Sequence, residues 1–177
     1  MKKIFIIILL CLFAQDTFGQ KALKKVNKAP SFEYTLLKGG ETGNLDTFKD
    51  KIIVLDFWFM KCKPCVEMIP TMEKLYQEFK DKDVVFLGVN STDKDTKALE
   101  EFLMANNVTY PTLLVEKESV DKTKYGVMGY PTVFIIDKSQ KITYEKVGAT
   151  IYTSKEGNKT SPEYKIIRKK LLKLLKK

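Results

Sequence analysis

The chain has 177 residues, of which 44% are apolar, so it can form one folded domain with a sizeable core and a short additional segment. Its formal net charge is +9, but the lysines alternate with acidic residues and no basic run carries interleaved aromatic side chains, which excludes nucleic-acid binding. Glycine and proline are scarce, which excludes a fibrous or low-complexity chain.

The N-terminal segment, residues 1–19, has the pattern of a signal peptide. Two lysines precede an apolar run that ends at Ala14 and is too short to span a bilayer comfortably. Thr17 and Gly19 are small residues at the −3 and −1 positions, so cleavage is expected after Gly19. An uncleaved anchor is the alternative. Under the first interpretation the mature protein is periplasmic or otherwise exported.

Residues 20–28 are rich in lysine and predict a flexible leader, after which residues 29–177 form a single domain. The domain opens with a predicted β-hairpin, because Phe32–Leu37 has strand character and three glycines between positions 39 and 43 mark turns. The apolar run Lys51–Phe59 then predicts a strand that is buried on both faces.

A helix is predicted next, directly after two cysteines. Its apolar residues recur at three- and four-residue steps and are Met68, Ile69, Met72, Leu75, Tyr76 and Phe79. Pro70 lies within this helix and is expected to kink it.

Strands and helices alternate over the rest of the chain. The expected elements are a strand at Val84–Val89, a helix capped by Thr92 or Asp93, a strand at Tyr110–Val115, a short helix or turn at Val120–Tyr125, strands at Thr132–Asp137 and Lys141–Val147, a polar loop at 150–161, and a C-terminal helix with Tyr164, Ile167, Leu171, Leu174 and Leu175 on its apolar face. This order predicts an α/β domain with a central mixed β-sheet flanked by helices and an N-terminal β-hairpin extension.

The sequence Cys62-Lys63-Pro64-Cys65 lies where the buried strand leads into the helix. Unpaired N–H groups and the helix dipole favour an anion at a helix start, and the thiolate is the form that attacks disulfides. Lys61 and Lys63 add positive charge beside Cys62. Because Cys65 follows at i+3, it lies at the same end of the helix, where it can resolve a mixed disulfide.

Two other interpretations of the cysteine pair have less support. A zinc site needs about four ligands, and the chain has no histidine and no second cysteine pair, so no metal is expected. A purely structural disulfide would close a very small loop and constrain the unfolded chain little.

Asp56 stands in the middle of the apolar run Ile52–Phe59, where an ionised carboxylate is costly. Desolvation at an inward-facing position would raise its pKa and suit it to exchange a proton with a neighbouring thiol. The alternative is that Asp56 faces outward on a half-exposed strand, since strand side chains alternate between two faces.

Three motifs together resemble thioredoxin: Val54–Trp58, the Cys-x-Pro-Cys sequence followed by Pro70, and Gly-Tyr-Pro-Thr at 129–132. The segments Ala29–Phe32, Phe48–Lys51 and Phe134–Asp137 resemble the TlpA/ResA-like branch of exported bacterial thiol–disulfide oxidoreductases. The resemblance covers about residues 29–175.

This resemblance implies a thioredoxin fold and a set of roles. Cys62 is the attacking thiol, Cys65 the resolving thiol, Asp56 a buried acid, and Pro131 a cis-proline opposite the disulfide. The residues expected to contact the substrate are Trp58, Lys61, Lys63, Pro64 and Tyr130. The chain departs from the family at Lys61, where many relatives have tryptophan, at Met68, where this branch often has glutamate, and at Gly88, where thioredoxin has lysine.

The sequence thus predicts an enzyme that exchanges dithiol and disulfide with protein substrates as a reductase, without metal or organic cofactor. We expect a monomer that a membrane electron donor recharges. A peroxiredoxin is one alternative, although the Pro-x-x-x-Thr stretch expected before its cysteine is absent before Cys62. A copper-delivery protein of the same fold is another, although the chain lacks the histidine that would favour it.

Overall fold

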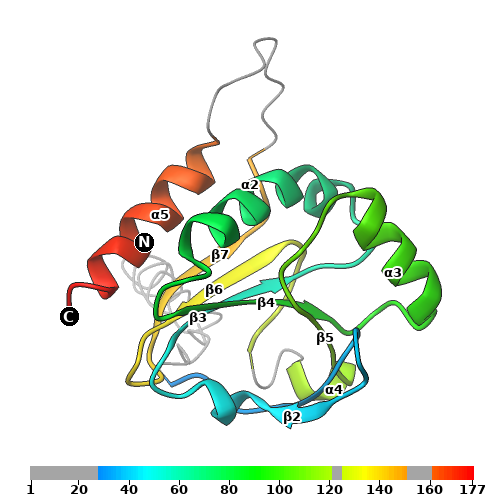
Figure 1. Cartoon of the computed structure of the whole chain (residues 1–177), viewed down its shortest axis with the longest axis horizontal. Helices are drawn as coiled ribbons and strands as arrows, with labels where there is room; N and C mark the ends of the chain where they lie inside the picture. Colours follow the sequence, from blue (N-terminus) through cyan, green and yellow to red (C-terminus); the bar gives the residue numbers. More distant parts are fainter. Residues whose placement is uncertain (1–27, 121–124, 151–160) are drawn as a thin grey trace, which may run out of the picture.

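The computed structural model describes residues 28–120, 125–150 and 161–177 (Figure 1). The expected signal peptide, nearly all of the expected leader and most of the 150–161 loop lie outside these residues. The predicted N-terminal hairpin is present: β1 (Glu33–Leu36) pairs antiparallel with β2 (Thr42–Asn44).

The remaining elements follow the predicted order, except around the short helix or turn expected at Val120–Tyr125. Residues 121–124 lie outside the described residues, and the helix that the structure describes there ends at Val120. The remaining elements are a short 3-10 helix η1 (Leu45–Phe48), β3 (Ile52–Phe57), α2 (Lys63–Phe79), β4 (Val84–Asn90), α3 (Thr96–Ala105), β5 (Thr112–Leu114), α4 (Lys117–Val120), β6 (Thr132–Ile136), β7 (Ile142–Val147) and α5 (Pro162–Leu174). The helix η1 has no counterpart among the predicted elements.

The strands form one seven-stranded sheet in the order β2-β1-β5-β4-β3-β6-β7. Strands β3, β4 and β5 are parallel, whereas the hairpin β1–β2 and the hairpin β6–β7 pair antiparallel with their neighbours. All six residues of β3 are buried, as its dense apolar sequence predicts for a central strand. The predicted mixed sheet is confirmed.

Helices cover both faces of the sheet (Figure 1). On one face, α2 and α5 pack against Ile52 and Val54 of β3 and their neighbours. The crossovers β3-α2-β4 and β4-α3-β5 advance in the same direction along the sheet, and right-handed crossovers therefore place α3 on that face too. On the other face, α4 and the chain around Tyr125 cover Ile53, Leu55 and Phe57.

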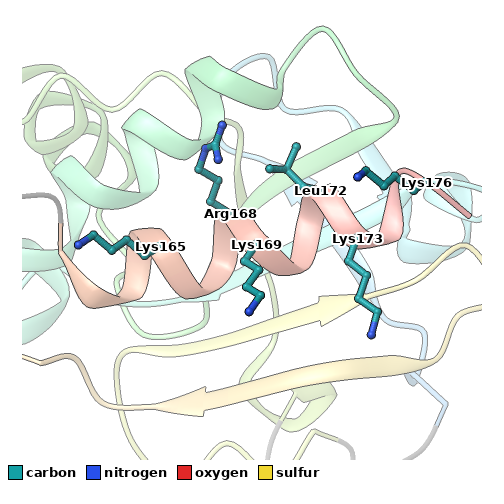
Figure 2. Close-up of a pocket in the computed structure, with 6 residues that line it drawn as sticks. All are labelled: Lys165, Arg168, Lys169, Leu172, Lys173 and Lys176. Carbon is teal, nitrogen blue, oxygen red and sulfur yellow. The ribbon is translucent and has the colours of Figure 1, made fainter.

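The C-terminal helix buries the face that its sequence predicts. Ile167 and Leu171 are buried against the sheet and α2, with Tyr164 and Leu174 packed beside them. The outer face carries a basic stripe along a shallow pocket, lined by Lys165, Arg168, Lys169, Leu172, Lys173 and Lys176 (Figure 2).

One detail differs from the sequence prediction. Helix α3 is capped by Asp95, whose side chain accepts a hydrogen bond from the N–H of Ala98, and not by Thr92 or Asp93. Asp93 is instead held in a polar turn with Asn90, so it cannot cap the helix. Pro70 lies inside helix α2, as expected, and the kink at this position stays a prediction. Over the described residues, no helix is long and apolar enough to cross a membrane.

Candidate active site

Cys62 and Cys65 form a disulfide at the N-terminus of α2, with an S–S distance of 2.01 Å. Cys62 is the N-cap residue, and its Sγ accepts the N–H of Cys65 at 3.3 Å. Pro64 lies in the first turn, where its missing N–H removes no helical hydrogen bond. The Cys62 sulfur thus lies where free N–H groups and the helix dipole stabilise a thiolate after reduction.

The disulfide is buried in an apolar cluster. Cys62 and Cys65 are only 6% and 3% exposed, and they pack with Trp58, Leu37 and Leu99. Trp58 was expected to contact substrate, but it is 3% exposed, and its ring stacks on Phe102 with 5.7 Å between centroids. Trp58 is held inside the protein because it follows β3 directly and packs beneath α3, so it supports the disulfide from within.

The loop that joins β3 to the cysteines is tied to the turn after β4. The N–H of Met60 donates to Oδ2 of Asp93 at 2.8 Å, and Asn90 donates to the same oxygen at 2.8 Å. The N–H of Cys62 donates to the carbonyl of Phe59 at 3.1 Å. Asn90 and Asp93 are not among the site residues that the sequence predicts, because no local pattern connects them with Met60, which lies 33 residues before Asp93.

The peptide bond between Tyr130 and Pro131 is cis, as the resemblance to thioredoxin implies. Phe57, the last residue of β3, pairs with Thr132, the first residue of β6. Pro131 therefore lies at the same end of these strands as the loop that carries the cysteines. The ring of Tyr130 packs edge-on against Phe59 with 5.2 Å between centroids, which joins the two loops.

Three of the expected substrate contacts lie beside the disulfide. Lys61 and Lys63 are exposed on either side of Cys62, and Pro64 is half-buried. The Pro131 carbonyl accepts the N–H of Gly148 at 2.7 Å, which holds the cis-proline turn against the end of β7.

Asp56 is buried, with 5% of its surface exposed, so the outward-facing alternative is wrong. It shares its strand face with Ile52 and Val54, and that face carries α2. Burial raises the pKa of Asp56 to about 7, although a hydrogen bond from Tyr110 lowers it in part. A carboxyl with this pKa can gain and lose a proton near neutral pH.

Tyr110 is the partner of Asp56 that the sequence analysis missed. Its hydroxyl donates to Oδ2 of Asp56 at 3.1 Å across 54 residues of chain. Burial and then the charge of Asp56 raise the pKa of Tyr110 well above its ordinary value, so the phenol stays protonated as a donor. No local sequence pattern connects Tyr110 with Asp56, because 54 residues of chain separate them.

Comparison with known proteins shows the family to which the chain belongs. Residues 26–145 match the AhpC/TSA family. The chain belongs to the AhpC/TSA family. Among its relatives, the thioredoxin-like protein YneN of Bacillus subtilis is 35% identical over 75% of this chain and 78% of its own length. The thiol-disulfide oxidoreductase ResA of Bacillus thuringiensis is 32% identical over 82% of this chain and 86% of its own.

Solved structures agree with these relatives. The thioredoxin domain of a thiol-disulfide oxidoreductase from Bacteroides vulgatus has a TM-score of 0.64 and 25% identity, and the match covers 80% of this chain and 94% of that one. A thiol:disulfide interchange protein from a Bacteroides species has a TM-score of 0.66 and 26% identity, over 81% and 87% of the two chains. This AhpC/TSA-family chain is a thioredoxin-like thiol–disulfide oxidoreductase.

Proposed function

We propose that the protein is an exported reductase that passes electrons from the dithiol of Cys62 and Cys65 to disulfides in other proteins. One arrangement carries this proposal. Cys62 caps α2 at the end of the central strands where Pro131 also lies, and Asp56 is buried on the face of the sheet that α2 covers. A nucleophile, a resolving thiol and a proton acceptor are the groups that thiol–disulfide exchange requires.

The reaction proceeds in two exchanges. The Cys62 thiolate attacks one sulfur of the substrate disulfide, forms a mixed disulfide and releases the other substrate sulfur as a thiolate, which takes a proton from solvent. Cys65 then gives its proton to the Asp56 carboxylate and attacks Cys62. The Cys62–Cys65 disulfide forms, the second substrate sulfur leaves and is protonated, and two electrons have passed to the substrate.

The residues around the sulfur atoms define the surface that the substrate protein contacts. Lys61 and Lys63 are exposed beside Cys62, while Pro64 and Tyr130 are half-buried and present apolar surface. In this proposal Trp58 acts from the interior, where it packs with the disulfide.

The proposal also concerns the whole chain. Residues 1–19 act as a cleaved signal, residues 20–28 as a leader, and residues 29–177 as the thioredoxin-like domain, which works as a monomer. A membrane electron donor returns the oxidised protein to the dithiol form, since a reductase that leaves each cycle oxidised needs such a source of electrons.

Trapping tests the assignment of the two cysteines. The reduced Cys65→Ser protein should accumulate a mixed disulfide with a peptide that carries one intramolecular disulfide, because the resolving thiol is gone. The Cys62→Ser protein is the matched control and should trap little. More adduct with Cys62→Ser than with Cys65→Ser would reverse the roles. Substrate-independent consumption of hydrogen peroxide by the reduced wild type would favour the peroxiredoxin alternative instead.

A further inference from the structure

Polar side chains lie beside Asp56 on the neighbouring strands, on the side away from the disulfide. Asp56 of β3 pairs in register with Gly88 of β4, and Gly88 pairs with Thr112 of β5. These three residues form a row across adjacent parallel strands. Their side chains point to the same face, the one covered by α2 and α3, because residues paired across strands share a face.

Gly88 keeps the middle of this row open for other side chains. A Cβ at Gly88 would lie 2.9 Å from Nε1 of Trp58 and 3.2 Å from both Oγ1 of Thr112 and Cε2 of Tyr110. Three polar side chains therefore converge over the glycine. A larger residue at this position would displace the indole or the phenol, and the phenol is the group that reaches Asp56.

Two of the converging groups are buried without a partner. Nε1 of Trp58 and Oγ1 of Thr112 find no hydrogen-bond partner among the residues that the structure describes. Both side chains are at most 5% exposed. An unpaired buried hydroxyl or indole N–H lowers the stability of a protein by roughly 1–3 kcal/mol. Two such groups around one glycine therefore indicate a functional role for this part of the core.

A pocket of about 570 Å³ reaches this row from the surface between α3 and the ends of the neighbouring strands β1 and β5. Tyr110 and Thr112 line it together with Leu37, Leu103 and Met104, and Lys38 and Glu100 also line it. Of the described residues around it, none belongs to the Cys62–Cys65 loop or to the Tyr130–Pro131 turn. Tyr110 thus contacts Asp56 at its hydroxyl and also borders a solvent-open pocket.

We propose that Tyr110 is a positioning residue for Asp56 and that Asp56 exchanges its proton with solvent past Tyr110 and Thr112 through this pocket. The proposal rests on the proposed role of Asp56 as proton acceptor. A substrate protein in the mixed disulfide covers the surface around Cys62, so a second opening lets Asp56 release the proton that it takes from Cys65. The step moves one proton from the Asp56 carboxyl to water and no electrons.

The charged groups near this path are few. Glu73 of α2 accepts hydrogen bonds from the N–H and hydroxyl of Thr109, and its charge further raises the pKa of Tyr110. Lys38 and Glu100 are exposed residues of β1's trailing turn and of α3, respectively. Tyr76 of α2 packs its ring against that of Tyr110, and the Cys62–Cys65 pair lies at the start of the same helix.

The test measures the resolution step directly. Reduced protein is mixed with Ellman's reagent, and release of the second thionitrobenzoate reports attack by Cys65 on the mixed disulfide. Rates are followed from pH 5 to 9, and the pKa of the Asp56 carboxyl is measured by carbon NMR titration. The variants are Tyr110→Phe, Thr112→Val and Asp56→Asn. Tyr76→Phe is the matched control, because its ring packs against Tyr110 with 6.1 Å between centroids.

Tyr110→Phe removes a hydrogen bond to the charged carboxylate, so the pKa of Asp56 should rise by about one unit and resolution below neutral pH should slow about tenfold. Thr112→Val should leave that pKa unchanged and slow resolution several-fold. Tyr76→Phe should change neither quantity. A wild-type pH profile in Tyr110→Phe would overturn the positioning role, and a wild-type rate in Thr112→Val would overturn the route through the pocket.

Asp56→Asn separates this proposal from the function on which it rests. If Asp56→Asn slows resolution while Tyr110→Phe and Thr112→Val do not, the proton acceptor stands and the path is wrong. If Asp56→Asn resolves at the wild-type rate, the role of Asp56 itself is wrong.

Discussion

The protonation of Asp56 affects the stability of the protein as well as its proposed chemistry. A carboxyl in the middle of a fully buried strand disfavours its own charged form, and burial raises its pKa to about 7. The folded protein therefore binds this proton more tightly than the unfolded chain, in which the pKa of aspartate is about 3.9. Its contribution to the free energy of unfolding is full below about pH 4, falls as the pH rises through about 7, and is absent above that.

We predict that Asp56→Asn removes this pH dependence. The stability of Asp56→Asn relative to the wild type should increase from pH 4 to pH 8 by roughly 4 kcal/mol, which corresponds to a pKa shift of about three units. Urea unfolding of the oxidised proteins across this range measures it. The exposed Asp81→Asn is the control and should show no such trend. A difference between Asp56→Asn and wild type that stays constant with pH would mean that Asp56 does not titrate in this window.

At the scale of the elements, α5 is attached to α2 by an apolar contact and a polar clamp. Ile167 and Leu171 are buried, and Glu78 of α2 accepts hydrogen bonds from the hydroxyl of Tyr164 at 2.6 Å and from Nε of Arg168 at 2.7 Å. Arg168 is 44% exposed, so solvent screens this ion pair and the apolar contact supplies most of the attachment.

Neighbouring leucines on α5 allow a matched comparison. Leu171 is fully buried, whereas Leu172 is half-buried at the margin of the same core and also lines the pocket among the lysines and Arg168 (Figure 2). We predict that Leu171→Ala lowers the free energy of unfolding by about 3 kcal/mol, because it loses apolar burial and leaves a cavity. Leu172→Ala should cost less, about 1 kcal/mol, because only part of its side chain is buried. Thermal unfolding of the two variants checks this, and equal losses would contradict the packing of α5 described above.

The redox potential is a property of the whole molecule, because it compares the oxidised and reduced states of the complete fold. Lys61 and Lys63 favour the Cys62 thiolate and thereby raise the potential, but both are exposed and screened. An ionised Asp56 on the α2 face opposes the thiolate and lowers the potential. The dipeptide between the cysteines contains no histidine, a residue whose positive charge stabilises a thiolate.

We therefore predict a potential nearer to the value of thioredoxin, about −270 mV, than to that of a strong oxidant, about −120 mV. Equilibration with glutathione buffers, followed by alkylation of free thiols, measures it. A Lys61→Gln/Lys63→Gln variant should have a slightly lower potential than the wild type. A wild-type value near −120 mV would contradict the assignment as a reductase.

Much of the fold follows from local patterns in the chain. The apolar run around Ile52–Phe57 predicts a strand buried on both faces, and the three- and four-residue spacing after Cys65 predicts α2; both are confirmed. These features are readable because periods of 2 and 3.6 residues reflect backbone geometry that each segment carries alone. The motif Cys-Lys-Pro-Cys is local in the same sense, since a helix start and its first turn contain all four residues.

Other features arise only when distant segments meet. The hydrogen bond between Tyr110 and Asp56, the anchoring of Met60 by Asp93 and the burial of Trp58 all join segments that are separated in the chain. Their contacts depend on which residues of β3, β4 and β5 pair in register, and on how α3 packs over Trp58. A one-residue change of register would turn Asp56 to the other face of the sheet, so its partner and its pKa are set by the assembled sheet and not by the strand alone.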